Sequence, residues 1–359
     1  MIGRVSTPTI RPTIASLPSY VAGRKPVSAL AAPLASNENP FDPLPSALAA
    51  AREAAESMNR YPDMAATGLR AAIASYHGVT PDQVAVGPGS SGVIQQLLDA
   101  VCDAGDEVIY AWRSFEAYPI IAAVSGAASI PVPLRADENH DLDAMACAIT
   151  RRTRLILLCS PNNPTGVPID RADLVAFLAK VPGFITVAID EAYADFAPSD
   201  LGALGLLAEH PNLCVLRTFS KAFGLAGLRV GYAIGNPELA SALRRTEVPF
   251  GVSTIAQRVA IASLEARDEL MVRVAAIVAE RDRVTGVLRE RGFSIPPTGG
   301  NFFWIRATGE PYLRLMAALD AADILARGFV SDGVRVSIGT PEQNDRVLAV
   351  LTTPELFFE

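Results

Sequence analysis

Short apolar runs alternate with helix-like segments through the middle of the chain. The runs predicted to be strands cover residues 84–86, 107–111, 129–133, 155–160, 185–190, 214–219 and 230–234. Stretches typical of helices, such as residues 91–102 and 171–180, lie between most of them. Continuous apolar strands separated by helices indicate an α/β fold, with a mostly parallel seven-stranded sheet covered on both faces.

The two ends of the chain have a different pattern. Residues 1–35 are rich in Pro, Ser and Ala, which indicates an irregular arm, and helices are predicted over residues 45–58 and 68–77. After Pro249 come a long helical stretch (253–291), a strand (302–305), a further helix and a strand (334–338), typical of a smaller α+β domain. The predicted parts are therefore an N-terminal arm that packs with the small domain (1–35), a large domain (36–248) and a small C-terminal domain (249–359).

Composition narrows the possible functions. Half of the 359 residues are hydrophobic and the net charge is −7, so a nucleic-acid surface is not expected. The N-terminus lacks the pattern of a signal peptide and no apolar stretch is long enough to cross a membrane, so we expect a cytoplasmic protein. The four cysteines have no metal-ligand spacing and the three histidines are scattered, so no metal site is predicted.

Polar residues follow several predicted strands at the point where each strand ends. They are found at residues 89–91, 162–163, 190 and 220–221. In open α/β sheets, ligands bind at the carboxyl ends of the strands. These positions are therefore predicted to form one binding site.

The segment GPGSSG, residues 87–92, joins a predicted strand to a helix. Free N–H groups at a helix N-terminus, with the hydroxyls of Ser90 and Ser91, suit a phosphate. A tight strand-to-helix turn needs glycines in any case, so this segment alone leaves both interpretations open. It matches neither a Walker loop nor the dinucleotide fingerprint, which disfavours ATP and NAD.

Three further positions suggest a ligand with an aromatic ring. Asn163 lies in a Pro- and Asn-rich segment that is either an ordinary turn or a source of amide donors. Asp190 ends an apolar strand, where a carboxylate either caps a helix or pairs with a cation such as a protonated pyridine nitrogen. Tyr193, three residues later, could reach a ring hydroxyl from the same side.

Lys221 is the strongest candidate for covalent chemistry. Most lysines are solvated surface residues, but this one follows an apolar strand and has small and apolar neighbours. Desolvation would lower its pKa and free the amine to form an imine. Ser220 adds a hydroxyl, and Arg229 offers a guanidinium fork for a phosphate. An imine-forming lysine, a pyridinium partner and a phosphate cradle are together the requirements of pyridoxal 5′-phosphate.

The sequence resembles the fold-type I aminotransferases, in the branch that holds histidinol-phosphate and aromatic aminotransferases. The resemblance spans nearly the whole chain and rests on SNENP (36–40), NRYPD (59–63), PNNPTG (161–166), DEAY (190–193), SKAFGLAGLR (220–229) and RVSIG (335–339). It implies a homodimer that acts on small molecules and carries the cofactor on Lys221 as a Schiff base.

The resemblance also implies a role for each site residue. Asp190 holds the pyridinium proton, Asn163 and Tyr193 bond the ring oxygen, and Phe115 stacks on the ring. The phosphate is held by Ser90, Ser91, Ser220 and Arg229, and by Tyr61 of the neighbouring subunit. Arg335 grips the substrate carboxylate, and the rest of the substrate side is formed by Asn37, Tyr20 and Arg327.

Within this branch, the segment WRSFEAYP (112–119) and residues 248–250 most resemble actinobacterial aromatic (phenylalanine) aminotransferases. The expected reaction is transamination of an aromatic amino acid with 2-oxoglutarate. The alternative is histidinol phosphate, for which Arg327, Arg24 or Lys25 could supply the second cationic site. A decarboxylase of the same branch is a rival enzyme, whereas a ligand-sensing regulator is disfavoured because only an irregular arm precedes the first match.

Overall fold

The computed structural model of the protein describes residues 8–17, 23, 30–198 and 201–353. Its large sheet has seven strands in the order β1-β7-β6-β5-β4-β2-β3. The strands are β1 (Val84–Gly87), β2 (Glu107–Trp112), β3 (Ala128–Pro133), β4 (Thr153–Cys159), β5 (Thr186–Asp190), β6 (Leu213–Thr218) and β7 (Gly231–Ile234). Only β7 pairs antiparallel with its neighbours β1 and β6. The predicted mostly parallel seven-stranded sheet is confirmed.

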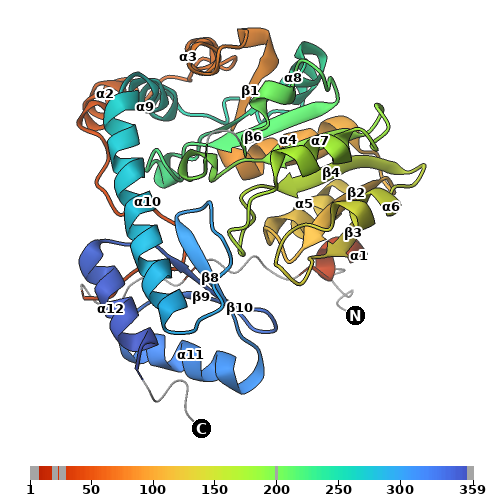
Figure 1. Ribbon diagram of the computed structural model, residues 1–359. Helices are drawn as coiled ribbons and strands as arrows, with labels where there is room; N and C mark the ends of the chain where they lie inside the picture. The colour runs from red at the N-terminus through yellow and green to blue at the C-terminus, as the bar shows by residue number, and fades with distance from the viewer. Residues whose placement is uncertain (1–7, 18–22, 24–29, 199–200, 354–359) are drawn as a thin grey trace, which may run out of the picture.

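Helices cover both faces of the large sheet (Figure 1). One apolar cluster joins the sheet to α4 (Gly89–Val101), α5 (Ala117–Ser125) and α8 (Pro237–Arg245). A second cluster joins the opposite face to α6 (Leu142–Cys147) and α7 (Arg171–Leu178). Along β4, Leu155 and Leu157 belong to the first cluster, and Ile156 and Leu158 to the second. Both faces of the strand are buried, which explains its unbroken apolar sequence.

The C-terminal part is built on a small antiparallel sheet of β8 (Phe302–Arg306), β10 (Gly333–Ser337) and β9 (Arg327–Phe329), in that order. The helices α11 (Gly309–Ala321) and α12 (Pro341–Leu351) lie beside this sheet (Figure 1). Strand β9 is not among the predicted strands, because three residues are too short for a periodic signal. None of the helices in the described ranges combines the length and apolar character that crossing a membrane needs.

The predicted single helix over residues 253–291 is two helices, α9 (Thr254–Glu265) and α10 (Arg267–Glu290). The break lies at Ala266, where ψ is 32° and the chain leaves the helical conformation. Alanine favours helix, so nothing in the local sequence marks this break. Helix α9 packs against α2 (Pro45–Ala55) and α3 (Thr67–His77), and α10 leads from there to the small sheet (Figure 1).

The segment before Asn37 runs beside the small sheet. Ala32 forms a bridge with Ile324, and the carbonyl oxygen of Leu34 accepts a hydrogen bond from the Ser337 amide at 2.9 Å. This segment therefore lies against β10. The boundaries assigned to the arm and the two domains stay a prediction.

Candidate active site

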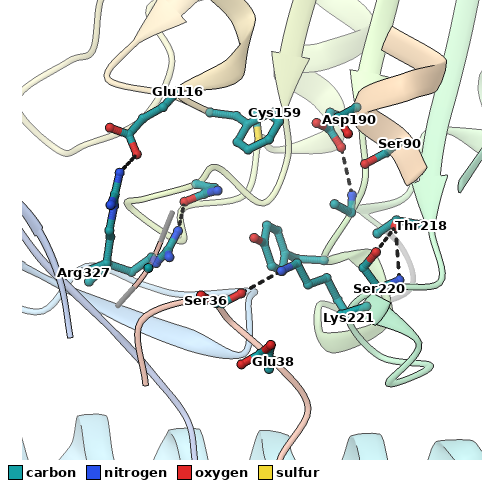
Figure 2. A pocket seen from close by; sticks show the side chains of 18 of the residues that line it. Ser36, Glu38, Ser90, Glu116, Cys159, Asp190, Thr218, Ser220, Lys221 and Arg327 are labelled. Carbon is teal, nitrogen blue, oxygen red and sulfur yellow. Dashed lines mark hydrogen bonds and ion pairs between the residues drawn. The ribbon is translucent and has the colours of Figure 1, made fainter. Parts of the chain in front are cut away.

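A cavity of about 600 Å³ lies where the carboxyl ends of β4, β5 and β6 meet the small sheet (Figure 2). Most of the residues predicted for the site line it: Ser90, Ser91, Phe115, Asn163, Asp190, Tyr193, Ser220, Lys221, Arg229, Arg327 and Arg335. The fold thus brings together side chains from distant parts of the sequence. The parallel strands are responsible, because their carboxyl ends meet at the same edge.

Lys221 projects into the middle of this cavity (Figure 2). Its Nζ donates a hydrogen bond to the carbonyl oxygen of Ser36 at 2.9 Å. Burial, followed by repulsion from Arg335, lowers the pKa of Lys221 to about 7. A large fraction of the amine is then neutral at physiological pH, and the neutral amine is the form that attacks a carbonyl carbon.

Asp190 ends β5 and is almost completely buried. Its Oδ1 accepts a hydrogen bond from the Ala192 amide at 3.2 Å, and its Oδ2 accepts one from the Tyr118 hydroxyl at 2.9 Å. Burial raises the pKa of Asp190 to about 6, although both hydrogen bonds favour the ionised form. A buried carboxylate in this position suits a cationic partner such as a protonated ring nitrogen.

A phosphate cradle lies at the N-terminus of α4. Gly89 begins this helix with φ at 78°, and a Cβ on it would overlap the Arg229 guanidinium. Glycine is therefore required both by the backbone conformation and by the close approach of Arg229. Arg229 Nη1 donates to Ser220 Oγ at 3.1 Å, and Thr218 Oγ1 lies 3.0 Å from the same oxygen. The helix N-terminus, the hydroxyls and the guanidinium together fit a phosphate.

Two polar side chains border the space between Lys221 and the small sheet. The buried Tyr193 hydroxyl accepts a hydrogen bond from Asn37 Nδ2 at 3.0 Å, and Asn163 Oδ1 accepts one from Arg335 Nη1. Asn37 is fully buried and is not among the residues that line the cavity. Its contact with the site is therefore made through Tyr193.

Two arginines from neighbouring strands border the side of the cavity formed by the small sheet. Arg335 on β10 faces Arg327 on β9, and Arg335 Nη2 also donates to the carbonyl oxygen of Ala35 at 2.5 Å. Arg327 Nη2 lies 2.6 Å from Glu116 Oε2, in an ion pair that links β9 to the start of α5. Figure 2 shows this pair on the opposite side of the cavity from Ser90 and Asp190.

Like Asn37, Tyr61 does not line the cavity. Tyr61 has 82% of its surface exposed, and its ring stacks on Phe250 with the centroids 4.5 Å apart. Tyr20 lies outside the described residues, as do Arg24 and Lys25.

Sequence reasoning missed several residues that do line the cavity: Ser36, Glu38, Glu116, Cys159 and Thr218. Glu116 adjoins Phe115, so a charge beside a candidate stacking residue could have drawn attention to it. Ser36 contributes a carbonyl oxygen, and a backbone contact leaves no signal in the sequence. Within the described part of the chain, no group of three or more His, Cys, Asp or Glu residues could hold a metal ion.

Comparison with known proteins agrees with this geometry. Residues 32–351 match the family described as aminotransferase class I and II. An aromatic amino acid aminotransferase from Streptomyces avermitilis is 52% identical over 349 residues, covering 96% of this chain and 97% of that protein. One from Thermobifida fusca is 49% identical over 350 residues, with the same coverage. A histidinol-phosphate aminotransferase structure from Sinorhizobium meliloti, in complex with pyridoxal-5′-phosphate, has a TM-score of 0.88 and 30% identity, covering 98% of both chains.

The lowered pKa of Lys221 predicts how capture of pyridoxal phosphate by the cofactor-free protein depends on pH. The neutral amine becomes more abundant as the pH rises to about 7, so the rate of imine formation should rise to near pH 8 and then level off. Stopped-flow absorbance measures this rate. A lysine with an ordinary pKa of about 10.4 would give a rate that still climbs tenfold per unit between pH 8 and 10, and that result would contradict the assignment. The Lys221→Ala variant should not show the absorbance change that accompanies imine formation.

Proposed function

Because the chain belongs to the class I and II aminotransferase family, we propose that it transfers the amino group of an aromatic L-amino acid to 2-oxoglutarate. The donor would be phenylalanine, tyrosine or tryptophan, and the products would be the aryl-pyruvate and L-glutamate. The names of the relatives from Streptomyces avermitilis and Thermobifida fusca support an aromatic substrate.

The ion pair between Glu116 and Arg327 is the observation that carries this choice of substrate. The carboxylate offsets the positive charge of Arg327, so this side of the cavity suits an uncharged aromatic side chain. The phosphate of histidinol phosphate would be repelled by Glu116, and the pair would have to separate to release Arg327. This arrangement favours an aromatic substrate over histidinol phosphate, the alternative.

The enzyme uses pyridoxal 5′-phosphate, and the residues present fit this cofactor. The cradle around Gly89 and Arg229 suits its phosphate, Asp190 suits its ring nitrogen, and Lys221 provides the amine. When bound, the cofactor supplies an electron-poor ring that weakens the bonds at the substrate Cα.

The remaining chemistry belongs to side chains of this chain. We assign to Lys221 the removal of the proton from the substrate Cα and its return at the cofactor C4′. Asp190 would keep the ring nitrogen protonated, and Phe115 would stack on the ring. Arg335 binds the substrate carboxylate with its two terminal nitrogens, which orients the Cα–H bond toward Lys221. Asn163 and Tyr193 donate hydrogen bonds to the ring oxygen.

We also propose a homodimer in which Tyr61 reaches the phosphate of the partner subunit. Tyr61 does not line its own cavity, and it lies in an exposed apolar patch with Phe250. Met64 and Val248, which are also exposed, border the same hollow as Phe250. Exposed apolar patches of this kind are typical of protein interfaces. The cytoplasmic location stays a prediction.

A single-turnover experiment tests the substrate class. The enzyme loaded with pyridoxal phosphate is mixed with phenylalanine or with histidinol phosphate, and loss of the visible cofactor band is followed. We expect fast conversion by phenylalanine and a rate constant at least tenfold lower with histidinol phosphate. Faster conversion by histidinol phosphate would reverse the assignment, and release of carbon dioxide without any oxo acid would indicate a decarboxylase.

Removing the carboxylate of Glu116 should change the charge that the enzyme prefers on the side chain of its substrate. In Glu116→Gln, Arg327 loses its ion-pair partner, so kcat/KM for histidinol phosphate should rise about tenfold relative to that for phenylalanine. The matched control is Glu138→Gln, since Glu138 pairs with Arg306 at 2.7 Å but does not line the cavity. If the ratio of kcat/KM for histidinol phosphate to kcat/KM for phenylalanine is the same in the wild type and in both variants, Glu116 does not set specificity.

Mixing two variants, each impaired at the cofactor site, tests the placement of Tyr61. Lys221→Ala and Tyr61→Ala are unfolded together and refolded, so that heterodimers form. If Tyr61 acts across the interface, one site of each heterodimer has both native residues, and wild-type cofactor affinity returns at that site. If Tyr61 acts within its own subunit, no native site forms, and cofactor retention stays at the level of Tyr61→Ala.

A further inference from the structure

Tyr118 is a fully buried tyrosine that lies next to the proposed cofactor site without lining it. It belongs to α5, in the core cluster between that helix and the large sheet. Its hydroxyl donates a hydrogen bond to Asp190 Oδ2 at 2.9 Å. Its ring meets the ring of Phe115 edge-on, with the centroids 5.5 Å apart. Tyr118 therefore contacts two of the residues assigned to the cofactor ring, Asp190 and Phe115.

The surroundings of Asp190 explain why this hydrogen bond matters. Burial and the nearby Glu191 favour the neutral acid, whereas Lys221 and the two hydrogen bonds favour the carboxylate. The Cys159 thiol and the Tyr193 hydroxyl are further titratable groups close by, and burial raises the pKa of each, to about 12 for Cys159, so both stay uncharged. Burial also raises the pKa of Tyr118 well above its ordinary value, which keeps its hydroxyl protonated and able to donate.

The two oxygens of Asp190 are held from different directions. The Ala192 amide fixes Oδ1 from the loop after β5, and Tyr118 fixes Oδ2 from α5. A carboxylate has about four acceptor positions, so both hydrogen bonds leave room for a ring N–H. Without the Tyr118 hydroxyl, Asp190 would be held through one oxygen only, and the plane of its carboxylate could rotate.

We propose that Tyr118 is a positioning residue of this aminotransferase, whose hydroxyl keeps Asp190 ionised and oriented toward the cofactor ring nitrogen. Its ring also supports Phe115, so that one side chain holds two of the groups that border the ring. Tyr118 touches neither cofactor nor substrate itself. The inference rests on the proposed function for the identity of the ligand, but the contact with Asp190 belongs to the chain alone.

Tyr118→Phe removes the hydroxyl and keeps the ring that supports Phe115. In the cofactor-free protein, we expect the midpoint of Asp190 ionisation to rise by about one pH unit, because a hydrogen bond to the charged form is lost. Carbon-13 NMR of labelled aspartate measures that midpoint, with Asp190→Asn identifying the signal. In the loaded protein, pyridoxal phosphate should bind about tenfold more weakly, as measured by equilibrium dialysis.

The matched control is Tyr110→Phe. Tyr110 lies in the same core cluster with its ring centroid 6.0 Å from that of Tyr118, and its hydroxyl lies near Ser129 rather than near Asp190. This variant should leave both the Asp190 midpoint and the cofactor affinity unchanged. An unchanged midpoint in Tyr118→Phe would overturn the inference. Equal weakening of cofactor binding in both variants would also overturn it, because that result indicates a general effect on the core.

A double-mutant cycle separates positioning from structural support. With Asp190→Asn already present, Tyr118→Phe should weaken cofactor binding no further, because the group on which the hydroxyl acts is gone. Additive losses would contradict a role through Asp190. Failure of the wild type to bind pyridoxal phosphate would refute the proposed function, whereas the midpoint in the cofactor-free protein would still decide the role of Tyr118.

Discussion

The burial of one amine, that of Lys221, is the constraint on which the rest of the site depends. An ammonium group inside the protein is costly unless it is paired, and the charge that acts most strongly on Lys221 is the cation Arg335. The protein meets this cost by holding the amine on the carbonyl oxygen of Ser36 and by lowering its pKa to about 7. The same desolvation that would destabilise a charged lysine prepares a neutral nucleophile.

Asp190 is an acid in the same cavity, and its pKa is shifted in the opposite direction from that of Lys221. Burial raises its pKa to about 6, so a single hydrogen bond has a large effect on how much carboxylate is present near neutral pH. Lys221 and Asp190 are therefore both shifted toward their neutral forms, and a cofactor with a cationic ring nitrogen and an aldehyde would relieve both. This shared shift is an electrostatic reason why the cavity suits pyridoxal phosphate.

Charged pairs also join the large sheet to the small sheet around the cavity. Arg113 lies 2.5 Å from Asp332, Glu116 lies 2.6 Å from Arg327, and Glu138 lies 2.7 Å from Arg306. Each pair has one member from the large-sheet side and one from the small-sheet side. Of these three pairs, only that of Glu116 and Arg327 lines the cavity, so it both links the two parts and sets the charge on that side of the cavity.

Local sequence patterns were sufficient to predict the parallel sheet and most of the residues around the cavity. The strands of the large sheet are local runs rich in apolar residues; Asp190 ends one of them, and Asn163, Ser220 and Lys221 come soon after others. Because strand ends meet at one edge of a parallel sheet, local patterns were enough to group these residues. The resemblance to a known family then connected them to Arg335, which a local pattern could not have done.

The groups that act on these residues from distant parts of the chain could be identified only from the fold. The Ser36 carbonyl that holds Lys221, the ion pair of Glu116 with Arg327 and the hydroxyl of Tyr118 on Asp190 all join segments far apart in the chain. The break between α9 and α10 could not be predicted from the sequence either. Alanine favours helix, although Ala266 itself has left the helical conformation. Propensity and periodicity act over a few neighbouring residues, whereas these contacts depend on how whole elements pack together.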